Sequence, residues 1–485
     1  MTTAAATRYE VIIGIEIHVQ LRTASKMFCG CSTDVAGAAP NSHTCPVCLG
    51  LPGALPVINR RAVEHVLATG HAIGATTLEV TRWDRKNYFY PDLPKGYQIS
   101  QYDLPLTKGG SLTVETSHGP VDVGITRAHL EEDTARLLHQ VDQSGRRISL
   151  VDFNRSGIPL MEIVTEPVIH SAEAARRYAE ELRLLLLTIG ASDAQMEGGQ
   201  MRVEANVSLR EPGTDAFGTR VEVKNMNSFR SVERAIAFEI ERQARALDEG
   251  TPLAQETRGW DDDRGLTYTM RPKEYSDDYR YFPEPDLPPL RADAAWLEEI
   301  AARLPELPAA RRARYRDSYG LSAYDAAVLV GDAGATALFE GVLAAEPGLS
   351  AKRVANWVTG EYLRLAKSSP GRGAVAAAGL AWLIGRVEAG ELSGSNAKEV
   401  FEHHFTSGEP VQAIVSGLGL RQISDAEALA GVVERVVEAN PAAVADVRAG
   451  KAQAVRFLVG QVMRETRGQA NAAVVQRVLE DRLSR

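Results

Sequence analysis

Apolar and polar residues alternate regularly along residues 11–21, near the start of the chain. Every odd position from Val11 to Leu21 is apolar. Because the side chains of a β-strand point alternately to opposite faces, Glu16, His18 and Gln20 share the face opposite the core. A glutamate and a histidine two positions apart can bind one metal ion together, although a solvated strand face explains the same pattern.

Further segments show the same alternation and predict more strands. Residues 121–125 alternate ahead of the acidic run 131–133, and residues 202–210 and 220–225 each present a polar face rich in Glu, Arg, Lys and Asn. Strands with one apolar and one polar face are typical of an antiparallel sheet. A face lined by carboxylates and cations suits Mg²⁺ and phosphate groups. We therefore expect an α+β domain built around an antiparallel β cradle.

The pattern changes near residue 290, where alternation gives way to Ala, Leu, Glu and Arg at helical spacing. A proline cluster at residues 283–289 marks the change, and a second break falls at residues 407–410. Proline interrupts regular structure and is typical of connections between domains. The expected organisation is a catalytic cradle domain at 1–293, an all-α helical domain at 294–407 and a small helical tail domain at 408–485.

A helix is expected between Lys451 and Arg467, and its two sides differ. Apolar residues fall on one side, and the other side carries Arg456, Gly460, Arg464 and Arg467 at spacings of four, four and three. A basic row on a helix is usually a solvated face. It is also the kind of local basic strip that binds phosphates of RNA.

Composition limits the class of protein without deciding its function. The chain has 485 residues, too many for one ordinary core, and a net charge of −9. This charge argues against a globally basic nucleic-acid binder but leaves room for a local basic surface. The N-terminal residues show no apolar signal-peptide region, and the weakly polar stretch 373–385 is shorter than a membrane span. We therefore expect a cytoplasmic protein without membrane contact.

All four cysteines lie in one short segment, at Cys29, Cys31, Cys45 and Cys48. A C-x-C pair followed by a C-x-x-C pair can supply four thiolates to one tetrahedral zinc ion. Four free thiols in a reducing compartment are the alternative. A zinc site closed by four thiolates has no open position, so the predicted Zn²⁺ in this knuckle, residues 29–48, is structural and not catalytic.

Aromatic residues and cations are mixed between Asp84 and Tyr97. Tyr88 and Tyr90 can stack on a base or ribose, and Lys86 can neutralise a phosphate, although a tyrosine-rich structural corner has the same composition. The sequence contains no G-x-x-x-x-G-K-[ST], so an ATP site here is not a P-loop. It also has no cysteine outside the knuckle, which argues against a cysteine-based glutaminase.

Several long motifs resemble the GatB family of tRNA-dependent amidotransferase subunits. They are residues 13–21 (IGIEIHVQL), 45–53 (CPVCLGLPG), 84–103, 129–133 (HLEED), 278–287 (DYRYFPEPDL), 457–463 and 468–471. The resemblance covers nearly the whole chain. It implies a cradle similar to the glutamine-synthetase fold, followed by helices and a tail that contacts tRNA.

The resemblance also implies a reaction and partners. The family phosphorylates the side-chain carboxylate of misacylated Glu-tRNA(Gln) or Asp-tRNA(Asn) with ATP and Mg²⁺, and ammonia then displaces the phosphate. The ammonia comes from an amidase subunit, and a small third subunit completes a heterotrimer. A non-enzymatic tRNA-binding scaffold for the amidase and a free-standing ammonia-dependent ligase for a small amino acid are the alternatives.

Residue roles are carried over from the family by position. The implied Mg²⁺ ligands are Glu16, His18, Glu132 and Glu162. The implied catalytic residues are Lys86, Glu204 and Arg280: Lys86 neutralises phosphate, Glu204 accepts a proton from ammonium or binds a second metal ion, and Arg280 recognises phosphate or carboxylate. Lys86, Tyr88 and Tyr90 are expected to bind ATP, and Arg456, Arg464 and Arg467 to bind tRNA.

Overall fold

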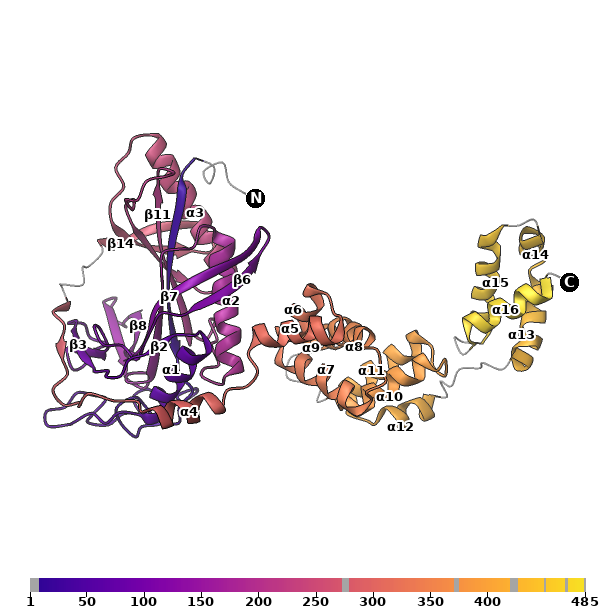
Figure 1. Ribbon diagram of the computed structural model, residues 1–485, viewed down its shortest axis with the longest axis horizontal. Helices are drawn as coiled ribbons and strands as arrows, with labels where there is room; N and C mark the ends of the chain where they lie inside the picture. Colours follow the sequence, from indigo (N-terminus) through magenta and orange to yellow (C-terminus); the bar gives the residue numbers. More distant parts are fainter. Residues whose placement is uncertain are drawn as a thin grey trace. The chain divides into compact units, whose positions relative to one another are not determined.

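The computed structural model describes residues 8–272, 279–369, 375–418, 426–448, 451–466 and 470–483. The chain divides into two compact units, residues 1–307 and 308–485. The first unit is a large sheet with flanking helices, and the second is helical (Figure 1). The expected α+β fold followed by a helical region is confirmed.

The main sheet of the first unit has ten strands, and β1 lies near its centre. The order from edge to edge is β14 (Leu266–Pro272), β13 (Glu256–Asp261), β12 (Val221–Met226), β11 (Met201–Arg210), β1 (Glu10–Gln20), β10 (Pro159–Thr165), β7 (Gly119–Glu132), β5 (Thr107–Lys108) and β2 (Thr76–Thr77), with β6 (Ser111–Thr116) paired to β7. All of these pairs are antiparallel except β12 with β13, which run parallel.

Two smaller sheets accompany the main sheet. The three-stranded sheet has the order β15 (Phe282–Pro283), β3 (Asp84–Asn87) and β4 (Tyr97–Ser100). The other is a hairpin of β8 (Arg136–Val141) and β9 (Arg147–Asp152). The three-stranded sheet joins residues that are far apart in the sequence, because Phe282 pairs with Arg85.

Helices α2 (Ala172–Thr188) and α3 (Phe229–Asp248) lie side by side against one face of the main sheet (Figure 1). Ser171 and Ser228 begin these helices, since each hydroxyl accepts a hydrogen bond from a backbone N–H of the first turn. The other helices of this unit are α1 (Arg60–Ala72) and α4 (Ala294–Ala302), which contact each other.

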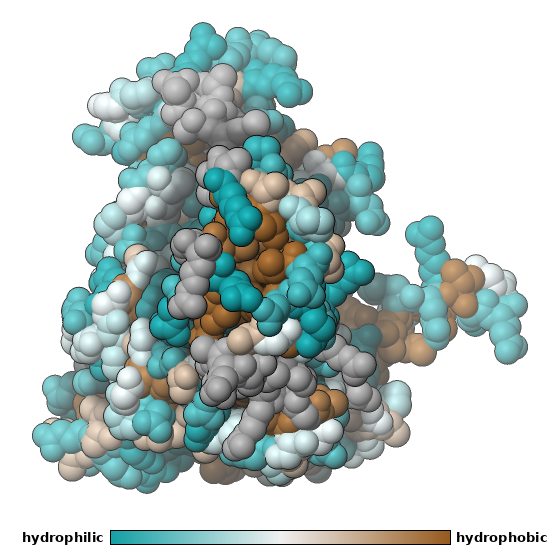
Figure 2. Space-filling view, turned by 90° about the vertical axis from the view of Figure 1, so that its right-hand side faces the viewer, coloured by the Kyte–Doolittle hydropathy of each residue, from teal (hydrophilic) through white to brown (hydrophobic). Residues whose placement is uncertain are grey.

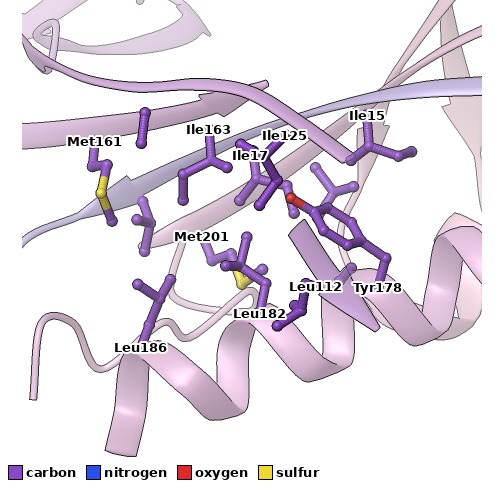
Figure 3. Packing of buried hydrophobic residues seen from close by; sticks show 14 of the residues in the cluster. Ile15, Ile17, Leu112, Ile125, Met161, Ile163, Tyr178, Leu182, Leu186 and Met201 are labelled. Atoms are coloured by element: carbon purple, nitrogen blue, oxygen red, sulfur yellow. The ribbon is translucent and has the colours of Figure 1, made fainter. Parts of the chain in front are cut away.

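The core lies between α2 and the odd-numbered side chains of β1. Tyr178 and Leu182 of α2 point toward Ile15 and Ile17, and all four are fully buried (Figure 3). Burying an aliphatic side chain of this size contributes about 1.5–3 kcal/mol. The odd positions of β1 are thereby held in the core, so the even positions face the other side of the sheet, as the alternation predicts.

The second unit is built from helices. They are α5 (Pro308–Tyr319), α6 (Ala323–Val330), α7 (Ala333–Ala345), α8 (Ala351–Trp357), the π-helix η3 (Val358–Tyr362), α9 (Leu363–Ser368), α10 (Ala377–Glu388), α11 (Gly394–Ser407), α12 (Val411–Leu418), α13 (Ala426–Ala439), α14 (Pro441–Arg448), α15 (Ala452–Glu465) and α16 (Ala472–Leu483). Gly408 ends α11 in the left-handed conformation, yet α12 packs on α10 and α11. Helices α13–α16 share a core of their own around Leu429, Leu458 and Leu479.

The structural units and the expected domains differ in detail. The first unit continues to Leu307 and includes α4, which lies beyond the expected boundary at 293. The domain boundaries given above stay predictions. In the part of the chain that is described, no single helix is long and apolar enough to span a membrane. The face drawn in Figure 2 is largely hydrophilic, with smaller apolar areas.

Candidate functional site

Functional side chains lie in one row across three neighbouring strands, on the sheet face opposite α2 and α3. His18 of β1 is paired with Glu162 of β10, and Glu162 is paired in turn with His129 of β7. Residues at the same register position on one face lie next to each other. The row therefore brings three chemically active side chains together from distant parts of the sequence.

His18, Glu131 and Glu162 form the first cluster that can hold a metal ion. His18 Nε2 lies 3.4 Å from Glu131 Oε1 and 3.3 Å from Glu162 Oε2. The three residues each offer one ligand atom, and these atoms all lie within 4.8 Å of one another. Both carboxylates are buried. A pair of buried carboxylates is costly unless a cation neutralises them, so the donor set fits a divalent cation with oxygen ligands.

Electrostatics in this cluster agree with a cation site. Burial works against charge on the His18 imidazole, but the Glu162 and Glu131 carboxylates outweigh it and raise the pKa of His18 to about 9. Burial raises the pKa of the Glu131 carboxyl group. A divalent cation in this position takes the place of the proton that His18 otherwise holds.

A second cluster shares only β1 with the first, continues onto β11 and β12, and consists of Glu16, Glu204 and Glu222. One oxygen from each carboxylate lies within 4.8 Å of the others. Lys224 Nζ contacts Glu204 at 2.7 Å, and Asn206 Nδ2 donates to Glu16 at 2.7 Å. Three converging carboxylates also suit an oxygen-ligated divalent cation.

Lys86 reaches the first cluster from β3 of the three-stranded sheet. Its Nζ lies 5.1 Å from the centre of the Tyr279 ring. Burial alone lowers the pKa of the Lys86 ammonium, but Glu131, Glu162 and the neighbouring tyrosines together outweigh burial, and the pKa is raised. Lys86 therefore stays charged beside the carboxylates, which is the state that a phosphate-binding lysine needs.

Glu132 does not join Glu131 and Glu162, contrary to the position expected for it. Its Oε1 accepts a hydrogen bond from the Ile99 backbone N–H at 2.9 Å and pairs with Lys95 Nζ at 2.6 Å. Successive side chains of a strand point to opposite faces, so Glu131 and Glu132 cannot both reach the row. In the structure, Glu131 occupies the place beside His18.

Arg280 is exposed and lies apart from both clusters. Its guanidinium carbon lies 5.6 Å above the Phe89 ring, and it makes no ion pair with the carboxylates of the described residues. Arg280 has a φ of 46°, and Asn87 Nδ2 donates to its carbonyl oxygen at 2.8 Å. The hydrogen bond explains how a non-glycine residue is held in the left-handed region.

Tyr88 and Tyr90 stack on each other with ring centres 5.8 Å apart. Tyr88 also contacts the Tyr279 ring edge-on at 6.4 Å. The two tyrosines therefore belong to an aromatic surface that begins beside Lys86, where base stacking is feasible.

A polar cavity of about 730 Å³ opens beyond Gln20, at the end of β1. Arg22, Arg136 and Arg155 line it together with Asp34 and other polar residues. Its volume is in the range of cavities that enclose a nucleotide-sized ligand.

The four cysteines converge as their spacing predicts. All four sulfur atoms lie within 4.8 Å of one another, and Cys45 Sγ and Cys48 Sγ are 3.8 Å apart. Four sulfurs at about 2.3 Å from a tetrahedral zinc ion are separated by about 3.8 Å, so this spacing fits a bound metal such as zinc. The hydrogen bond between the Cys29 and Cys48 sulfurs lowers the pKa of Cys48 and raises that of Cys29, so Cys48 is the thiolate of this pair and Cys29 the thiol.

The basic row of the tail lies on the exposed side of α15. Arg456, Gly460 and Arg464 are exposed, whereas Leu458 and Val462 are fully buried in the core of α13–α16. Arg467, the last residue of the predicted row, lies outside the described residues.

Sequence reasoning missed Glu131, Glu222, Lys224 and His129 as members of the site. The alternation that identified Glu16 and His18 also applies to Glu222 and Lys224, so it was a sufficient signal for these two. It does not identify His129 and Glu131, because a register shift in β7 between Ile125 and Arg127 reverses which positions face the core. Their common register with β1 was not visible in the sequence.

The motifs, the sheet and the helical units place the chain in a known class of proteins. Residues 11–298 match the GatB/GatE catalytic domain, and residues 337–483 match the GatB domain. The resemblance found in the sequence is confirmed.

Proteins similar over their whole length share one name, the B subunit of aspartyl/glutamyl-tRNA(Asn/Gln) amidotransferase. The one from Moorella thermoacetica is 50% identical over 478 residues, covering 98% of this chain and 100% of the relative. Those from Roseiflexus castenholzii and Thermomicrobium roseum are also 50% identical, over 484 and 481 residues, with 98% of this chain and 99% of each relative covered. This chain belongs to that family of B subunits.

Proposed function

We propose that this chain is the kinase and amide-forming component of a tRNA-dependent amidotransferase. It phosphorylates the side-chain carboxylate of Glu-tRNA(Gln) or Asp-tRNA(Asn) with ATP, and ammonia then displaces phosphate to give the amide. Amidotransferase is the activity named in its relatives. The observation that carries the proposal is a pair of carboxylate clusters on one sheet face, with Lys86 beside the first of them.

The chemistry requires activation because a carboxylate is a poor acyl donor. A carboxylate oxygen attacks the γ-phosphorus of ATP, ADP leaves, and a mixed acyl phosphate remains on the amino acid. Ammonia attacks the acyl carbon, phosphate departs with the bonding electrons, and one proton is lost from nitrogen. Phosphoryl transfer depends mainly on positioning and on neutralising the charged oxygens.

Residues of the site divide this work. His18, Glu131 and Glu162 would hold one Mg²⁺ ion, and Glu16, Glu204 and Glu222 would hold a second. Bound Mg²⁺ neutralises phosphate oxygens and orients them for transfer. Lys224 Nζ lies 2.7 Å from a Glu204 oxygen and offsets part of the negative charge of the second cluster.

The remaining expected roles follow the same scheme. Lys86 neutralises the transferred phosphate, and Tyr88 and Tyr90 stack on the adenosine of ATP. Arg280 lies apart from the clusters, so its proposed task is to bind a phosphate of the substrate at the entrance. Zn²⁺ in the cysteine knuckle is structural.

The partners belong to the same proposal. The amidase subunit supplies ammonia from glutamine, the small third subunit completes the heterotrimer, and the complex works in the cytoplasm on misacylated tRNA. Arg456 and Arg464 of the tail contact tRNA phosphates, because both are exposed and they lie about two turns apart on α15.

The test uses the assembled three-subunit enzyme with charged tRNA, ATP and glutamine. His18→Ala should abolish ATP-dependent phosphorylation while the glutaminase activity of the amidase partner continues. Transamidation near the wild-type rate in this variant contradicts the assignment of the site. Wild-type enzyme that amidates without cleaving ATP favours the alternative, a non-enzymatic tRNA-binding scaffold.

A further inference from the structure

Five tyrosine rings form a continuous ladder beside the three-stranded sheet. Tyr90 stacks on Tyr88, Tyr88 contacts Tyr279, Tyr279 contacts Tyr281 at 6.0 Å, and Tyr281 stacks on Tyr102. The last pair is the flattest, with ring centres 4.3 Å apart and planes within 10°. The ladder therefore ends in a planar pair at Tyr102.

The ladder passes beside the first cluster. Its middle ring, Tyr279, has its centre 5.1 Å from Lys86 Nζ. Ser100, two residues before Tyr102, donates a hydrogen bond from its Oγ to Glu131 Oε2 at 3.3 Å. Tyr102 lies one ring beyond Tyr281 and is 47% exposed. The stacked pair thus connects the carboxylate cluster to solvent.

The main chain of Tyr102 is anchored although its ring is partly exposed. Its backbone N–H donates to the buried Asp84 carboxylate at 3.1 Å, shortly after strand β4. The ring itself stacks on Tyr281, and a partly exposed aromatic ring of this kind can continue its stack with a planar base.

We propose that the exposed face of Tyr102 stacks on the 3′-terminal adenine of the charged tRNA. This inference rests on the proposed function, because it takes the reacting carboxylate to lie at the cluster near Lys86. The amino acid is esterified to the terminal ribose, and a glutamyl side chain spans only about 5 Å at roughly 1.5 Å per bond. The terminal nucleoside must therefore lie close beside the cluster.

Two cations next to Tyr102 favour tRNA over ATP as the source of this adenine. Arg82 Nη2 donates to Asp103 Oδ2 at 2.7 Å, and Lys108 Nζ donates to the Asp103 carbonyl oxygen at 3.2 Å. The tRNA chain continues outward from its last nucleotide and carries further phosphates, which these cations can meet. ATP directs its phosphates toward the metal clusters instead and has none on the outer side.

Exposure does not separate the two ends of the ladder, because Tyr90 and Tyr102 are both 47% exposed. The choice of tRNA for Tyr102 rests on the neighbouring cations. The opposite end of the ladder, at Tyr88 and Tyr90, is the part proposed above for ATP.

The direct test uses the assembled enzyme and a tRNA with 2-aminopurine at its 3′-terminal position. Stacking quenches the fluorescence of this base, so wild type and Tyr102→Phe should quench it on binding, whereas Tyr102→Ala should not. Phe217→Ala is the matched control, because Phe217 is another exposed aromatic residue of the first unit, 64% exposed, and should leave the quenching unchanged. Equal quenching by Tyr102→Ala and wild type overturns the proposal.

Kinetics separate the two sources of adenine. Tyr102→Ala should raise the KM for charged tRNA about tenfold, the loss of one base–aromatic stack, and leave the KM for ATP unchanged. Lys108→Ala should reduce the salt dependence of tRNA binding by about one charge. A raised KM for ATP in Tyr102→Ala, with the tRNA KM unchanged, overturns the proposal. Failure of the proposed kinase function can be told apart from failure of the stacking proposal. In the first case wild type cleaves no ATP, while the quenching experiment still reports whether Tyr102 stacks on the terminal adenine.

Discussion

Two neighbouring glutamates of β7 should respond in opposite ways to the same substitution. Glu131 faces His18 and Glu162 in the first cluster, whereas Glu132 pairs with Lys95. Glu131→Gln and Glu132→Gln each remove one negative charge and keep the side-chain shape. We expect the first to impair catalysis with little effect on stability, and the second to impair stability.

The magnitudes follow from the contacts of each carboxylate. Loss of a residue that only hydrogen-bonds to a metal ligand typically weakens metal binding by about 10–100-fold. Loss of Glu131, a direct ligand in this proposal, should therefore slow phosphorylation by at least about 100-fold, which raises the activation free energy by roughly 2.7 kcal/mol. Burial raises the pKa of Glu131, so its charged form is costly in the folded protein and glutamine should not destabilise the fold. Glu132→Gln leaves the largely buried Lys95 without its counter-charge, which should cost about 3 kcal/mol of folding free energy.

Two measurements on the assembled enzyme decide between these outcomes. ATP-dependent phosphate release is followed with charged tRNA over a range of Mg²⁺ concentrations, and thermal unfolding is measured on the same samples. Glu131→Gln should need more Mg²⁺ or fail at every concentration. The reasoning is refuted if Glu132→Gln abolishes phosphate release at unchanged stability while Glu131→Gln behaves as wild type.

Three further predictions concern other parts of the chain. Purified protein should contain one zinc ion per chain by elemental analysis, and Cys45→Ser should lose both the metal and thermal stability; a metal-free, fully folded wild type contradicts this. Removal of residues 419–485 takes away α13–α16 and leaves α12 packed on α10 and α11. This truncation should raise the KM for charged tRNA several-fold and flatten the salt dependence of that KM, while glutaminase activity is retained. Equal KM values and equal salt slopes for truncated and full-length chains show that the basic row is only a solvated face. Burial lowers the pKa of His65 to about 4 in the folded protein, whereas an unfolded histidine has a pKa of about 6.5. Between these two pH values the unfolded chain binds a proton that the folded protein does not, so stability is lost as the pH falls from 6.5 toward 4. At pH 5 the free energy of unfolding, measured in urea, should be lower by about 2 kcal/mol in wild type, and this loss should be absent from His65→Gln. Parallel curves of unfolding free energy against pH for the two proteins contradict this role of His65.

Much of the fold was predictable because strand alternation is a local property. The odd positions of β1 predicted its buried face, and the cysteine spacing predicted the convergence of four sulfur atoms. The change near residue 290 predicted the helical second unit. These features depend on neighbours in sequence, so the sequence alone contains them.

The site was less predictable, since it depends on which strands become neighbours. The family resemblance pointed to Glu132, whereas the register with which β7 pairs with β10 brings Glu131 to the face of His18. Glu222 joins Glu16 through β11, which lies between their strands. Tyr102 and Tyr281 meet because β15 pairs with β3, a contact between segments nearly two hundred residues apart that no local pattern reveals.

The row of side chains across β1, β10 and β7 limits how such a chain can change during evolution. One residue inserted into any of these strands turns every later side chain to the other face, which exchanges metal ligands for core residues in a single event. Insertions and deletions should therefore accumulate in connections such as the turn between β8 and β9, where the register of the row is unaffected. Strand lengths in this sheet are expected to stay constant among relatives while its surface loops vary in length.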